Sequence, residues 1–201
     1  EYHISKYGEN YDYYKFAEEF NKEGEKWNPD EWAQLFSEIG AKYVVITTKH
    51  HDGFTLWQSK TKHPYIKPEY QGSQRDIVGE LTQAVRAKGM RMGLYYSGGF
   101  DWGFSKEPIK NFRELNGPAS EEYARFADAH WRELIELYKP SVLWNDISYP
   151  QDGDLMGIIA DYYNKVPDGV IDNRWLRKSD VNRSLFTLGI LKPKIFYDFD
   201  T

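Results

Sequence analysis

The sequence at residues 28–54 reads NPDEWAQLFSEIGAKYVVITTKHHDGF and predicts one helix followed closely by one strand. Asn28 is a good N-cap and Pro29 fits the first turn, so a helix is expected to run from here to Gly40, which can end it. Residues 43–48 are a short β-branched run, typical of a buried strand. The stretch therefore predicts a helix and a strand joined by a short connection.

The same unit recurs downstream, because apolar residues return at helical spacing before each further β-branched or aromatic run. Helices are expected at about 76–88, 120–138 and 154–165. Strands are expected after them at 90–95, 142–144 and 170–171, and a further one at 195–199. Alternating helices and strands with short helix-to-strand connections predict parallel βα units.

The fold class expected is α/β, as an incomplete portion of a (β/α)8 TIM barrel. The segments after the strands, such as 50–75 and 96–119, are long, as they are on the functional face of a barrel. A doubly wound open sheet is the competing arrangement, but no glycine-rich phosphate-binding motif follows any strand. Four clear strands fall short of the eight strands and about 250 residues of a closed barrel.

Composition excludes several classes of function. The net charge is −5, so the chain has no broad attraction for nucleic acid. It has no cysteine, which excludes thiolate metal sites, and no apolar run of the ~20 residues that a membrane span needs. Aromatic residues make up 17% of the chain, and carbohydrate sites use aromatic rings to contact the flat faces of sugars. Most of these rings are nevertheless expected in the core.

Polar and aromatic residues stand where each expected strand ends, which is how a barrel active site is distributed along a sequence. The candidates are His50, His51, Tyr95, Trp144, Asp146 and Arg174. Strand parity places Asp146 on the same side as Trp144. A carboxylate at a barrel mouth suits glycoside hydrolysis, although spacing alone leaves a turn or capping role equally open.

The other candidates also have two interpretations. Neighbouring residues on a strand point to opposite faces, so His50 and His51 are not expected to share a metal ion unless the strand has ended. Hydrogen bonds to substrate hydroxyls suit them better, and one of the pair can be structural. Arg174 can hold a hydroxyl or the nucleophile, or form a strand-end salt bridge, and Tyr95 can contact substrate or Asp146, or simply pack. No metal and no cofactor is expected.

The motifs at these positions resemble those of the glycoside hydrolase family 29 α-L-fucosidases. The resemblance lies in KHHDGFTLW at 49–57, YYS at 95–97, LWND at 143–146 and NRW at 173–175. The opening segment, with YGEN at 7–10, is also similar, so the resemblance extends in order over nearly the whole chain.

This resemblance implies a retaining exo-hydrolase that removes terminal α-L-fucose from an oligosaccharide or glycoconjugate. Asp146 matches the family nucleophile, and His50, His51, Tyr95, Trp144 and Arg174 match positions that contact fucose. It also implies a location where glycans are found: the periplasm, the cell exterior or the lysosome. Oligomeric state and linkage preference are not predicted.

The chain departs from the family pattern at both ends, so residues 1–201 are expected to be a partial catalytic domain. In the family a first barrel strand with its own histidine lies upstream, and the acid/base carboxylate lies downstream. No spacing supports Glu69, Glu107, Asp172 or Asp198 as that acid/base, and none is assigned. The chain alone is therefore expected to be weakly active or inactive. Two alternatives stay open: another retaining glycosidase on the same barrel, and a non-catalytic carbohydrate-binding barrel.

Overall fold

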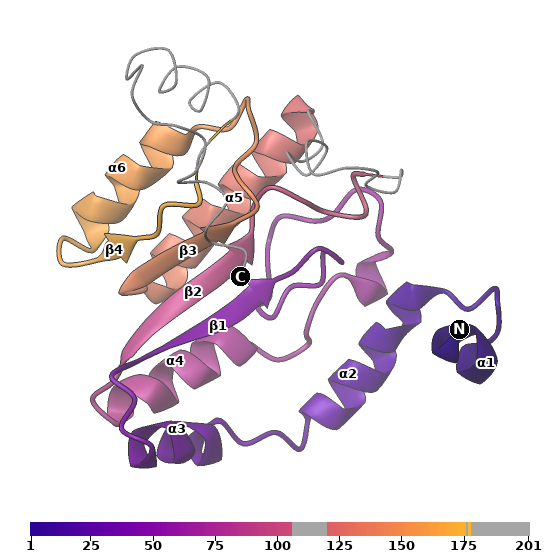
Figure 1. The fold of residues 1–201 in the computed structure, drawn as a ribbon, viewed down its shortest axis with the longest axis horizontal. Coiled ribbons are helices and arrows are strands. Elements are labelled where there is room, and N and C mark those ends of the chain that lie inside the picture. Colours follow the sequence, from indigo (N-terminus) through magenta and orange to yellow (C-terminus); the bar gives the residue numbers. More distant parts are fainter. Residues whose placement is uncertain (106–119, 176, 178–201) are drawn as a thin grey trace.

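The computed structural model describes residues 1–105, 120–175 and 177, and in this part four parallel strands form one sheet (Figure 1). The strands lie in sequence order: β1 (Tyr43–Lys49), β2 (Arg91–Ser97), β3 (Val142–Asp146) and β4 (Val170–Ile171). All four had been predicted, and β2 and β3 each extend two residues beyond the expected end. The strand expected at 195–199 lies outside the described residues.

The four predicted helices are confirmed, and each precedes a strand. They are α3 (Pro29–Glu38), α4 (Ile77–Ala87), α5 (Glu121–Tyr138) and α6 (Leu155–Lys165). Each begins at a side chain that accepts a backbone N–H bond of its first turn, namely Asn28, Asp76, Ser120 and Asp154. Such caps contribute about 1 kcal/mol each, so the helix starts are encoded locally.

Further helical segments precede and interrupt these units and had not been predicted. Residues 2–24 contain α1 (Tyr2–Tyr7), the 3₁₀ helix η1 (Tyr13–Lys15) and α2 (Phe16–Gly24), and η2 (Pro68–Tyr70) lies between β1 and α4. In Figure 1 α1 and α2 extend away from the sheet, beyond the end of β1. They therefore lie on the side of the sheet where β1 is its last described strand.

The core lies between the sheet and the helices. Met92, Leu94 and Leu143 are fully buried on the helix-covered face, and α3 packs beside α4 as α5 does beside α6. The predicted inward residues of α5 are all buried: Tyr123, Phe126, Ala127, His130, Trp131 and Leu134. Burying such side chains supplies most of the stabilisation of the fold, about 25 cal/mol for each Å² of apolar area.

Helix α3 is the exception to this pattern. Its apolar residues follow helical spacing, yet Trp32, Leu35 and Ile39 are 49%, 55% and 71% exposed, and Ala33 is buried. The spacing thus predicted the helix correctly, but this face remains largely exposed in the described structure, apart from the edge-on contact of Trp32 with Trp27.

The arrangement is that of part of a (β/α)8 barrel. Parallel strands bring their carboxyl ends to one edge of the sheet, and the register places Tyr96 beside Lys49 and Asp146 beside Ser97. The residues that end the strands therefore meet at one edge, as the predicted fold class requires.

Candidate active site

Asp146 is the last residue of β3, and three groups hold its carboxylate. The phenol of Tyr95 on β2 donates to Oδ2 at 2.7 Å, and Nη1 of Arg174, beyond β4, lies 2.9 Å from Oδ1. The backbone N–H of Ile147 donates to the same Oδ1 at 2.9 Å. Neighbouring strands thus bring a phenol and a guanidinium to one carboxylate.

The burial of β3 alternates along the strand, as strand parity predicts. Leu143 and Asn145 are fully buried on the helix side, whereas Trp144 is 37% exposed and Asp146 is partly exposed. Trp144 stands in register with Tyr95. Trp144, Asp146 and Tyr95 therefore lie on the face of the sheet away from the helices.

The backbone after Asp146 turns sharply. Ile147 and Ser148 have φ values of 57° and 62°, a left-handed conformation that is strained for non-glycine residues and above all for a β-branched one. The N–H of Gly99 donates to the Asp146 carbonyl at 3.1 Å, and a Cβ on Gly99 would meet the Ile147 carbonyl oxygen at 1.4 Å. Glycine is required there so that the loop after β2 can reach this turn.

The two adjacent histidines follow the end of β1, so strand parity does not separate them. The rings of His50 and His51 stack with centroids 4.0 Å apart and planes inclined by 23°. The His50 ring also stacks with Tyr95 at 6.0 Å. The pair and the Tyr95–Asp146 group therefore form one continuous array.

The electrostatics of this array favour a neutral imidazole at His51. Burial, followed by His50 and Lys49, lowers the pKa of His51 to about 4, so the ring is uncharged at neutral pH. Its Nε2 is buried and has no hydrogen-bond partner among the described residues. Burial and the bond to Asp146 raise the pKa of Tyr95, which therefore remains a donor. His51 can thus offer a hydrogen bond to a hydroxyl.

Asp172 is a partly buried carboxyl group next to β3, and nothing in the sequence indicates its burial. Its Oδ1 accepts a bond of 3.2 Å from the Asn145 N–H, and Oδ2 is buried without a partner in the described part of the chain. Burial raises the pKa of Asp172 to about 6. This carboxyl lies against the backbone of β3, whereas Glu69 is exposed on the long loop after β1. Glu107 and Asp198 lie outside the described residues.

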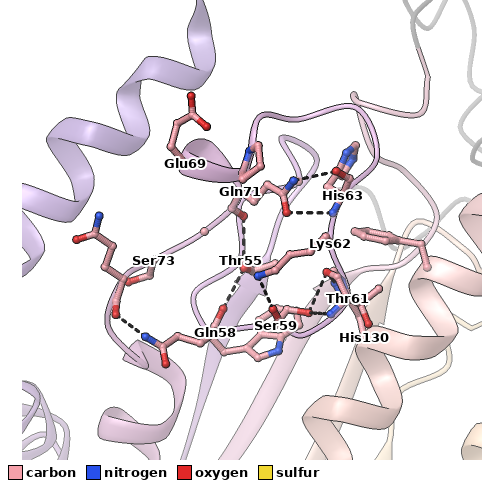
Figure 2. A pocket seen from close by; sticks show the side chains of 16 residues that line it. Thr55, Gln58, Ser59, Thr61, Lys62, His63, Glu69, Gln71, Ser73 and His130 are labelled. Carbon is pink, nitrogen blue, oxygen red and sulfur yellow. Dashed lines mark hydrogen bonds between the residues drawn. The ribbon is translucent and has the colours of Figure 1, made fainter.

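Figure 2 shows a polar cavity of about 330 Å³ inside the loop between β1 and α4. Gln71 donates to the His63 carbonyl at 2.8 Å and accepts from the His63 N–H at 3.1 Å. Gln58 donates to the Gln74 carbonyl at 2.6 Å, and Glu133 of α5 accepts four bonds from Trp57, Ser59 and Thr61 beside the cavity. These bonds join parts of the loop to one another and to α5, and none of the six sequence-predicted site residues lines the cavity.

A second, largely apolar cavity of about 320 Å³ lies beside His50, between α2 and β1. In residues 1–105, 120–175 and 177, no three His, Cys, Asp or Glu side chains are grouped so that they could hold a metal ion. No helix in these ranges is both long and apolar enough to cross a bilayer.

Comparison with known proteins identifies close similarity to one family. The family model described as alpha-L-fucosidase matches residues 1–189. The tissue alpha-L-fucosidase of Mus musculus is 34% identical over 176 residues, which are 84% of this chain and 37% of the mouse protein. The plasma alpha-L-fucosidase of Homo sapiens is 36% identical over 158 residues, 74% of this chain and 32% of the human protein.

Solved structures give the same result. The alpha-fucosidase of Thermotoga maritima in complex with fucose superposes with a TM-score of 0.79 at 49% identity, over 87% of this chain and 41% of that one. A GH29 alpha-L-fucosidase of Bacteroides thetaiotaomicron superposes with a TM-score of 0.60 at 29% identity, over 79% of this chain and 36% of the other. The chain thus spans a little over a third of the length of the first relatives it matches.

Proposed function

This chain belongs to the α-L-fucosidase family, and from that premise we propose that it carries the nucleophile and fucose-binding residues of a retaining exo-glycosidase. The substrate is a terminal α-L-fucose on an oligosaccharide or glycoconjugate. Residues 1–201 form part of one catalytic barrel domain. The observation that carries the proposal is the carboxylate of Asp146 at a strand end, held by Tyr95 and Arg174.

Asp146 acts as the nucleophile in a double displacement. In the first step one of its oxygens bonds to the anomeric carbon while the bond to the leaving oxygen breaks, and a general acid protonates that oxygen. In the second step water attacks the same carbon and releases the carboxylate, so two inversions retain the anomeric configuration. Because Tyr95 and Arg174 donate to the carboxylate from both flanks, it is oriented before the sugar arrives.

The remaining predicted residues bind the sugar. His51 is neutral at working pH and has a free Nε2 in the described structure, which suits a fucose hydroxyl. His50 stacks between His51 and Tyr95, and Trp144 presents an exposed ring on the same face as Asp146. An aromatic ring on that face suits the apolar side of a deoxy sugar.

The general acid is not assigned among the described residues. The contacts of Asp172 do not support that role, because its Oδ1 accepts a hydrogen bond from the backbone N–H of Asn145 and its carboxyl group therefore faces β3. Glu69 is exposed on the loop after β1, and no contact of it with Asp146 or Tyr95 is found among the described residues. A second carboxyl about 5 Å from the nucleophile is needed for retention.

An assay of the full-length protein with 4-nitrophenyl glycosides tests this function. Hydrolysis of the α-L-fucoside in preference to the other glycosides supports it, and proton NMR should show α-L-fucose as the first anomer released. Release of the β-anomer first would contradict retention. Binding of L-fucose without any hydrolysis would instead indicate a carbohydrate-binding barrel.

A further inference from the structure

Three buried charged or polar side chains lie beneath the histidine pair, and the proposed chemistry does not use them. Lys49, Asp101 and His63 are 0%, 0% and 4% exposed. Nζ of Lys49 lies 2.9 Å from Oδ2 of Asp101, and Nε2 of His63 lies 3.0 Å from Oδ1. These groups are sealed within the described structure, and they come from the end of β1, the loop after β2 and the loop after β1.

The hydrogen bonds of His63 show that its ring donates to Asp101. The N–H of Tyr65 donates to Nδ1 of His63 at 3.1 Å, so the ring proton lies on Nε2 and is donated to Asp101. Asp101 also accepts from the N–H of Gly103 at 2.9 Å. Burial alone would raise the pKa of Asp101, but Lys49 and His63 outweigh burial and lower it to about 2. Asp101 is therefore a carboxylate that accepts bonds from Lys49, His63 and the Gly103 N–H.

Asp101 and the next residue, Trp102, each make a hydrogen bond to the segment 49–51. Its carboxylate holds the side chain of Lys49, which directly precedes His50. The next residue, Trp102, donates its backbone N–H to the carbonyl of His51 at 2.7 Å. Residues 49–51 are thus attached to the dipeptide 101–102 at both ends, once through an ion pair and once through the backbone.

The packing leaves this attachment little freedom. A Cβ on Gly103 would meet the His63 ring at 2.2 Å, and one on Gly53 would lie 3.2 Å from Asp101. The ammonium of Lys49 also lies over the ring of Tyr96, 4.9 Å from its centroid. A buried ion pair contributes little net stability compared with apolar residues of the same size, so stability alone does not account for this one.

We propose that Asp101 is a positioning residue that holds the His50–His51 pair in the geometry needed to bind the hydroxyls of fucose. The proposal rests on the proposed function of the site. In this proposal Asp101 does not contact the reacting atoms of the substrate; that contact belongs to Asp146. Loss of the Asp101 charge should therefore weaken substrate binding more than it slows the chemical step.

The test compares Asp101→Asn with Glu133→Gln in the full-length protein. Glu133 is a carboxylate that, unlike Asp101, is only partly buried; it accepts four bonds from the loop after β1, and none of them reaches residues 49–51 or 101–102. With an aryl α-L-fucoside, Asp101→Asn should raise KM about tenfold and change kcat less than about threefold. Glu133→Gln should lower thermal stability and leave KM unchanged. Equal KM values for wild type and Asp101→Asn, or equal increases in both variants, overturn the proposal.

Two further measurements cover the remaining outcomes. If Asp101→Asn does not fold, the double variant Lys49→Met/Asp101→Leu removes both buried charges, and it should fold with the same increase in KM. A wild-type KM in that variant overturns the proposal. If the wild-type protein neither cleaves nor binds fucose, the proposed function fails. The positioning role is then tested separately by long-range ¹H–¹⁵N NMR spectra of the histidine rings. Asp101→Asn should shift the ring signals of His50 and His51, whereas Glu133→Gln should not. Unshifted signals in Asp101→Asn would overturn the positioning role.

Discussion

The phenol of Tyr95 donates a hydrogen bond of 2.7 Å to Oδ2 of Asp146 across the neighbouring strands β2 and β3. The opposite oxygen, Oδ1, faces the guanidinium of Arg174 at 2.9 Å. Because one oxygen is engaged from within β2 and the other from the turn after β4, the two contacts together orient the plane of the carboxylate. The activity proposed for the protein depends on this arrangement.

Substitution Tyr95→Phe removes one of these bonds and keeps the ring. A hydrogen bond to a charged group is worth about 1.5–3 kcal/mol, so kcat should fall roughly 10- to 100-fold in a steady-state assay. Tyr138→Phe is the matched control, because Tyr138 donates a bond of the same 2.7 Å length to the helix-capping Asp76. If the control lost as much activity as Tyr95→Phe, the bond to Asp146 would have no special role.

Substitution Arg174→Lys keeps the positive charge but loses the planar donor fork that faces Asp146. The value of kcat/KM should therefore fall about tenfold or more, because a lysine cannot reproduce the directed guanidinium bond. Arg125→Lys is the control, since Arg125 forms an exposed pair with Glu121 on α5 at 3.2 Å. Unchanged kinetics in Arg174→Lys would show that charge alone suffices.

The raised pKa of Asp172 gives a pH dependence of stability with a definite sign. The carboxyl has a pKa near 3.8 when unfolded and about 6 when folded. Between about pH 4 and 6 the folded state holds the extra proton, so this group makes stability fall as pH rises. Asp172→Asn should lack this loss, so that its stability relative to wild type increases from pH 4 to pH 7 in urea titrations. A constant difference across that range would argue against a raised pKa.

The core should respond to truncation of Leu143 on β3, which is fully buried on the helix-covered face of the sheet beside Leu94 of β2. Leu143→Ala should cost about 2–5 kcal/mol of unfolding free energy, the range for a buried leucine that leaves a cavity. Leu137→Ala on α5 is the control, because that side chain is 56% exposed and should change stability by less than about 0.5 kcal/mol. Denaturant titration of both variants measures the difference.

Local signals in the sequence were sufficient for the repeating helices and strands. Asn28 caps its helix as expected, the helix expected from about residue 120 begins there, and Gly40 follows the end of α3 with a φ of 81°. The segment before residue 28 was not predicted, since its short helices α1 and α2 have few buried residues to set a pattern. Nor could spacing show that the apolar face of α3 would remain exposed, because that depends on which elements surround it.

The candidate site was predictable as a set of strand ends, because parallel strands bring those ends to one edge. Strand parity placed Trp144 and Asp146 on one side, but the bond between Tyr95 and Asp146 depends on the register of two strands, which spacing does not give. The stacking of His50 on His51 depends on β1 ending at Lys49, one residue beyond the predicted strand. The Lys49–Asp101 pair joins residues 52 positions apart, so no local pattern could indicate it.

Covalent labelling tests the nucleophile most directly. The full-length protein is incubated with a 2-deoxy-2-fluoro-α-L-fucosyl donor, which slows the second step so that the glycosyl-enzyme accumulates. Peptide mass spectrometry should then find one fluorofucosyl group on Asp146, and none after the substitution Asp146→Asn. A label on Asp172 or on any other carboxylate, or full turnover by Asp146→Asn, would contradict the assignment of Asp146.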